Sequence, residues 1–121
     1  MPKKIGFRVR LDGKSSAEVR KALKELQTKK PEKCKEILLE WASFIEGRAK
    51  EIVPVRTGNL KNSIMFEILK GGFAAEIGTH VEYAPYVEFG TSRMRAKPYL
   101  VPSFEQSVQI FLEKIRKELS K

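Results

Sequence analysis

The chain has little of the chemistry that marks enzymes and metal proteins. It holds one cysteine, Cys34, and one histidine, His80, among 121 residues. A single cysteine excludes an internal disulfide framework, and no motif around Cys34 indicates a nucleophile, so we expect it to act as a small apolar residue. Glu76 and Glu82 flank His80, but this spacing is not a recognised ligand pattern, and a structural zinc site needs four ligands. We therefore expect no metal and no cofactor, and an enzyme is the class that the sequence favours least.

Long apolar runs and phosphate-binding loops are also missing. No apolar run approaches the length of a membrane span, and the first residues lack the apolar stretch of a signal peptide. The Gly71-Gly72 pair lacks the Lys-Ser/Thr sequence that follows a phosphate-cradling loop. The length suits one domain, which we place at residues 1–121. These observations predict a protein that is made and folded in a cytosol and does not enter a membrane.

Positive charge is in excess, and it is unevenly spread. Lys and Arg number 24 against 15 Asp and Glu, which gives a net charge of +9. Residues 1–50 hold 14 of these basic residues against 7 acidic ones. Such a charge can attract nucleic acid or an acidic protein. A solvated lysine-rich surface is the simpler interpretation, because the early lysines alternate with glutamates at helical spacing.

The first half of the chain predicts one strand and two helices. Ile5–Leu11 alternates apolar and polar residues, as a half-buried strand with a basic face does. Ser15–Glu18 has the form of a capping box, which predicts a helix to about Thr28. After a break at Lys29-Lys30, apolar residues recur at three- and four-residue steps from Pro31 to Ile52, and they predict the longest helix. Gly47 lies inside this helix, which suggests that another backbone packs closely there.

The second half predicts a hairpin and a last helix. Ile64–Leu69 and Phe73–Ile77 read as strands, and the glycines between them supply the positive φ angles of a tight turn. The pattern leaves open which face of the hairpin points inward. Pro102 and Ser103 begin a helix with a single apolar stripe. We therefore expect an α+β fold, in which a small antiparallel sheet of the hairpin and the N-terminal strand packs against the long helix and the C-terminal helix.

The stretch Val81–Leu100 fits no long periodic element, yet it is too aromatic for a solvated linker. We expect a short turn of helix around Pro85 to Phe89, followed by an exposed basic loop. Its aromatic side chains could simply cap the core, because they carry a large apolar area. Alternatively, the stretch is an assembly surface, since loops on a rigid scaffold often carry function and interfaces are rich in Tyr, Met and Arg. The candidate interface residues are Tyr83, Tyr86, Phe89, Arg93, Met94, Arg95 and Lys97.

Three blocks of sequence carry a resemblance to a known family. Ile52–Ile64 contains a proline and a Thr-Gly-Asn-Leu turn, and Tyr83–Thr91 reads Tyr-Ala-Pro-Tyr-Val-Glu-Phe-Gly-Thr. Lys97–Phe104 then leads into the last helix through Lys-Pro-Tyr-Leu. In this order and spacing the blocks resemble the small tail components of bacteriophages with long non-contractile tails and of prophages. The resemblance covers approximately residues 35–115.

This resemblance implies a structural virion-assembly protein that is not an enzyme. It would be a minor tail protein that acts in tail completion or head–tail joining, as a homo-oligomer such as a ring. Its partners would be other neck or tail proteins, and it would be assembled in the host cytoplasm. Thr57 and Gly58 would fix one turn, and Gly90 and Thr91 would shape the bend of the loop.

A small basic nucleic-acid-binding domain is the alternative from another class. It would use Arg8 and Arg10 on the first strand and the basic loop from Arg93 to Lys97. The resemblance itself allows a non-specific contact with DNA at this loop. The two functions therefore share part of their candidate surface.

Overall fold

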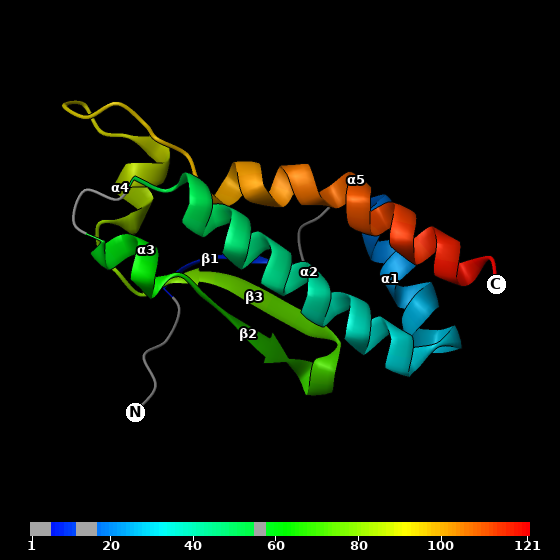
Figure 1. The fold of residues 1–121 in the computed structure, drawn as a ribbon. Helices are drawn as coiled ribbons and strands as arrows, with labels where there is room; N and C mark the ends of the chain where they lie inside the picture. The colour runs from blue at the N-terminus through cyan, green and yellow to red at the C-terminus, as the bar shows by residue number, and fades with distance from the viewer. Residues whose placement is uncertain (1–5, 12–16, 55–57) are drawn as a thin grey trace.

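A computed structural model describes residues 6–11, 17–54 and 58–121 of the chain. The long helix α2 (Pro31–Ile52) packs against a small antiparallel sheet, and α5 (Leu100–Leu119) packs along α2 (Figure 1). The first helix, α1 (Ala17–Lys29), lies beside the C-terminal half of α5 (Figure 1). The expected α+β fold is confirmed.

The sheet has the order β1-β3-β2, with both pairings antiparallel. β2 (Met65–Leu69) and β3 (Ala74–Thr79) form the hairpin, and they are joined by a short 3-10 turn, η1 (Lys70–Gly72). β1 (Phe7–Arg10) pairs with the other side of β3, so the N-terminal strand joins the hairpin as expected. The central strand β3 is buried along its whole length.

The two faces of the sheet differ in chemistry. On one face, Ile77 of β3 is fully buried and pairs with Val9 on one side and Phe66 on the other. On the basic face, Arg8 and Arg10 lie 3.4 Å and 3.7 Å from one carboxylate oxygen of Glu76, which is itself buried. The basic face expected for the first strand is therefore neutralised in part by the neighbouring strand.

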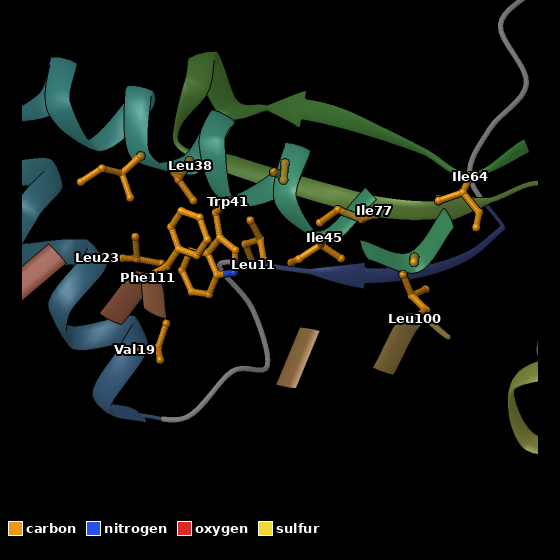
Figure 2. Packing of buried hydrophobic residues seen from close by; sticks show 14 of the residues in the cluster. Leu11, Val19, Leu23, Leu38, Trp41, Ile45, Ile64, Ile77, Leu100 and Phe111 are labelled. Atoms are coloured by element: carbon orange, nitrogen blue, oxygen red, sulfur yellow. The ribbon is translucent and has the colours of Figure 1, made fainter. Parts of the chain in front are cut away.

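The core centres on Trp41 of α2, which is fully buried. Its ring stacks nearly parallel to Phe111 of α5, with 5.5 Å between ring centres, and its indole nitrogen donates a hydrogen bond of 2.7 Å to Ser107. Figure 2 shows these two rings among Leu23 of α1 and other buried side chains. The residues of all three long helices thus share one core, which holds α2, α5 and α1 together.

Several boundaries differ from those expected from the sequence. β3 begins after Phe73 and continues to Thr79, and α5 begins at Leu100 rather than at Pro102. The prediction that another backbone packs closely at Gly47 is wrong, because a Cβ atom added there would meet no atom within 4 Å. The expected capping box at residues 15–18 lies largely outside the described residues, as does Thr57. Among the described residues, no helix has the length and apolarity that a membrane crossing requires.

Candidate assembly surface

A six-residue helix, α4 (Ala84–Phe89), presents Tyr86 and Phe89 to solvent, and Tyr83 directly precedes this helix. Tyr83, Tyr86 and Phe89 occur at three-residue steps, and their exposed fractions are 39%, 57% and 65%. Met94, in the loop that follows, is 40% exposed. We call these four side chains the aromatic end, because α4 and its loop project at the end of the molecule opposite the C-terminus (Figure 1).

The aromatic residue that closes the core at this end is Tyr99, and it is not one of these four side chains. Tyr99 is fully buried, and its hydroxyl donates a hydrogen bond of 3.1 Å to the backbone oxygen of Ala84, the first residue of α4. Burial, reinforced by the nearby Glu88 carboxylate, raises the pKa of Tyr99 above its ordinary value. Phe89 makes an edge contact with Phe7, with 5.7 Å between ring centres, and is 65% exposed. The core at this end is therefore closed by Tyr99, while Tyr86 and Phe89 stay more than half exposed.

A buried carboxylate fastens α4 to the start of α5. Glu88 is only 2% exposed, and its Oε1 accepts hydrogen bonds from the backbone amides of Tyr99 at 3.3 Å and Leu100 at 2.8 Å. Its Oε2 accepts a third, from the amide of Val101 at 3.3 Å. The first amides of a helix have no partner within the helix, and a negative charge there is favoured by the helix dipole. Glu88 thus caps α5 although it lies 11 to 13 residues before the amides that it binds, and this role was not predicted from the sequence.

The loop between α4 and α5 is held by its own backbone. Gly90 has a φ of 78°, and a Cβ atom there would lie 2.8 Å from the amide nitrogen of Ala96 and 2.9 Å from the backbone oxygen of Met94. The hydroxyl of Thr91 accepts hydrogen bonds from the amides of Arg93 and Met94 at 3.2 Å and 3.0 Å. Only glycine combines this φ with so close an approach of backbone. Gly90 and Thr91 therefore lie in the turn that opens this loop.

The same loop carries three exposed cations. Arg93, Arg95 and Lys97 all lie at the surface, and the amide of Lys97 donates a hydrogen bond of 2.8 Å to the backbone oxygen of Val87 in α4. Within the described part of the chain, no carboxylate comes within 4.0 Å of the three cationic groups. The loop therefore offers positive charge beside the aromatic end to whatever approaches it.

A second short helix, α3 (Asn59–Ser63), lies next to α4 (Figure 1). Gly58 precedes it with a φ of 73°, and its backbone oxygen accepts a hydrogen bond from Asn62. The side-chain amide of Asn59 donates a bond of 3.5 Å to the hydroxyl of Tyr83. The two motif blocks that are separated in sequence thus meet at one end of the molecule.

The residues considered for chemistry, Cys34, Glu76 and Glu82, lie in different surroundings in the structure. Cys34 is 1% exposed, burial raises the pKa of its thiol, and its sulfur lies 3.9 Å from the backbone oxygen of Leu23. Glu76 is engaged by two arginines of β1, and Glu82 is exposed. No three His, Cys, Asp or Glu side chains of the described residues gather as metal ligands would.

Comparison with protein families identifies a match over residues 17–90, to the family described as "Bacteriophage HK97-gp10, putative tail-component". The chain belongs to this HK97 gp10-like family. The match begins at the first residue of α1 and ends at Gly90. As a tail component, the protein is a structural part of the phage particle and meets other tail or neck proteins.

The family match and the resemblance cover different ranges of the chain. The family match includes α1, and it stops before the block from Lys97 to Phe104. Comparisons with curated proteins and with solved structures find no significant match.

Proposed function

We propose that this tail component acts at the head-proximal end of the tail, in tail completion or head–tail joining, and that the aromatic end is its contact surface. In this proposal the chain has no enzymatic role and is assembled with its partners in the host cytoplasm. The observation that carries the proposal is the exposure of three aromatic side chains, two on α4 and one directly before it, while α4 itself is firmly attached. Tyr86 and Phe89 are more than half exposed, although each carries a large apolar area.

The attachment of α4 matters because a contact surface binds best when little has to be ordered. Tyr99 and Glu88 fix the helix to the core, and Gly90 fixes the loop that follows it. A preorganised aromatic surface loses little conformational entropy on binding, and exposed aromatics and arginine are the side chains that dominate interface energies. The exposed apolar area would then be covered in the assembled particle rather than left in water.

A ring is the arrangement that we propose for the subunits. Closed rings form through head-to-tail contacts, in which one surface of a subunit meets a different surface of the next. The aromatic end lies at one extremity of the molecule, where it can reach beyond its own subunit (Figure 1). In solution, Tyr86→Ala should then lower the mass measured by light scattering while thermal unfolding stays unchanged. An unfolded Tyr86→Ala chain would instead place Tyr86 in the core.

The function itself is tested by complementation of a phage that lacks the gene for this chain. The wild-type chain should restore particles in which heads and tails are joined, as counted in electron micrographs. The double variant Tyr86→Ala, Phe89→Ala should accumulate in the cell but leave heads and tails separate. The matched control is Leu39→Ala, Ile110→Ala, which removes two side chains that are 49% and 44% exposed on α2 and α5. Full restoration by the aromatic variant would overturn the proposal.

Contact with nucleic acid is the second candidate, and the three exposed cations of the loop support it. Arg8 and Arg10 support it less, because both lie beside Glu76. Binding through the phosphate backbone falls steeply with salt, since counterions are released. Affinity for duplex DNA that stays unchanged from low to moderate salt would exclude this function.

A further inference from the structure

A groove with a positively charged rim lies between α1, the first turns of α2 and the turn η1. Its volume is about 680 Å³. The rim carries Arg20, Lys21 and Lys24 from α1 and Lys70 from η1, and all four are exposed. No acidic residue lines the groove within the described part of the chain.

The positive charge of the three α1 cations on the rim is not neutralised by the acidic residues of α1, because these form ion pairs with other residues. Glu18 forms an ion pair with Arg116 of α5, and Glu25 bonds to Lys29 at 2.9 Å. Lys29 is the main cause of the lowered pKa of Glu25, and Lys21 contributes less. Among the described residues, no carboxylate lies within 4.0 Å of the charged groups of the three α1 cations. The field of these three cations is therefore available to a negatively charged partner.

The floor of the groove is apolar. Leu23, Cys34 and Phe73 line it, and the first two are buried. The ammonium group of Lys35 lies 5.2 Å from the centre of the Phe73 ring, so a cation already covers part of this aromatic face. A groove with an apolar floor and a cationic rim suits a ligand that brings both an apolar group and negative charge.

We propose that this groove binds an acidic peptide segment of a neighbouring protein, with one apolar side chain of the segment seated on the floor. Charge complementarity argues against a second copy of this chain reaching in with its aromatic end, because Arg93, Arg95 and Lys97 flank that end. Like charges brought together across an interface are unfavourable. A DNA backbone would satisfy the rim but would leave the floor without an apolar partner.

This inference does not rest on the proposed function of the aromatic end. The groove involves α1 and η1, whereas the aromatic end lies on α4 at the far end of the molecule (Figure 1). A tail component with two separate surfaces can contact two different neighbours at once. The two proposals can therefore fail separately.

The test uses a short fluorescein-labelled peptide in which glutamates flank a central Leu-Phe pair, and binding to the wild-type chain is followed by fluorescence anisotropy. Two further probes separate the contributions: a peptide with serines in place of Leu-Phe, and a single-stranded DNA of equal charge. We expect the first peptide to bind most tightly and to weaken as salt is raised. The double variant Lys21→Glu, Lys24→Glu should weaken it by at least about tenfold, since several favourable charge contacts become repulsive.

The matched control is Lys61→Glu, Lys117→Glu, which changes the net charge equally at two sites outside the groove. It should change the affinity by less than about threefold, as expected for long-range charge alone. NMR shifts of backbone amides should locate the peptide beside Gln27 and Phe73. Equal losses in the two double variants, shifts confined to other parts of the chain, or a DNA affinity equal to that of the peptide would each overturn the proposal.

Discussion

Glu88 provides the sharpest test of how the aromatic end is held in place. The structure gives this buried carboxylate three backbone amide partners at the start of α5. A hydrogen bond to a charged group contributes about 1.5–3 kcal/mol, and losing a helix cap costs about 0.5–2 kcal/mol. Two of the three bonds are long, at 3.3 Å, so we expect Glu88→Ala to lower the free energy of unfolding by about 2–4 kcal/mol.

Urea unfolding measures this loss directly. With a slope of about 2 kcal/mol per molar urea, in the middle of the range for a small domain, the midpoint should fall by about 1–2 M. Glu88→Gln keeps one acceptor oxygen but places an amide NH₂ among backbone donors, so it should lose about 1–2 kcal/mol. The control is Glu82→Ala, which removes an exposed carboxylate near α4 and should change stability by less than about 0.5 kcal/mol. If Glu88→Ala behaved like Glu82→Ala, the cap that we describe would not contribute to the fold.

Two further predictions concern the same end of the molecule. Gly90→Ala should lower the free energy of unfolding by about 1–3 kcal/mol in thermal unfolding, because Gly90 has a positive φ and lies close to the backbone of Ala96. Gly47→Ala should raise it by up to about 1 kcal/mol, because Gly47 is in an open helical position. Equal effects of the two variants would refute the loop geometry. Tyr99→Phe should lose about 1 kcal/mol near neutral pH, since a buried carbonyl is left without its donor. Because burial raises the pKa of Tyr99 in the folded state, the contribution of its protonated hydroxyl to stability is present below about pH 10 and is lost as the pH rises further. Above that pH, the stability of the wild-type chain should therefore fall more steeply than that of Tyr99→Phe. Parallel pH profiles would contradict this prediction.

The helices and the hairpin could be predicted because their signals are local. Apolar residues at helical spacing define α2, and the break at Lys30 separates it from α1 as expected. Gly71 and Gly72 have positive φ angles of 65° and 110° in the turn, and paired glycines in a sequence indicate such a turn. That β1 joins the hairpin could be expected from the marginal stability of two strands alone, whereas the structure shows that its partner is β3.

The start of α5 could not be predicted, because it depends on a residue that is distant in sequence. Proline in the first turn of a helix suggested a start at Pro102. The carboxylate of Glu88 supplies the amides of Tyr99 and Leu100 with an acceptor, so the helix begins earlier. No local pattern around Glu88 indicates this role, since its partners lie 11 to 13 residues away.

The candidate surface was found from composition, while its geometry needed the structure. An aromatic stretch interrupted by Pro85 and Gly90 could equally have capped the core. The structure separates the two roles, with Tyr99 inside and Tyr86 and Phe89 outside. The cationic groove was not found from the sequence, because its rim combines residues of α1 with Lys70 of η1, far along the chain.

The most direct test of the aromatic end as a contact surface is site-specific photo-crosslinking in assembled phage particles. Phe89 is replaced by benzoylphenylalanine, and Leu39, exposed on α2, is replaced in the same way as the control. We predict that irradiation joins the Phe89 variant to a neighbouring subunit or tail protein, and that the Leu39 variant gives much less product. A Phe89 variant that is incorporated into particles yet stays at the 13.8 kDa of the single chain after irradiation would contradict the account.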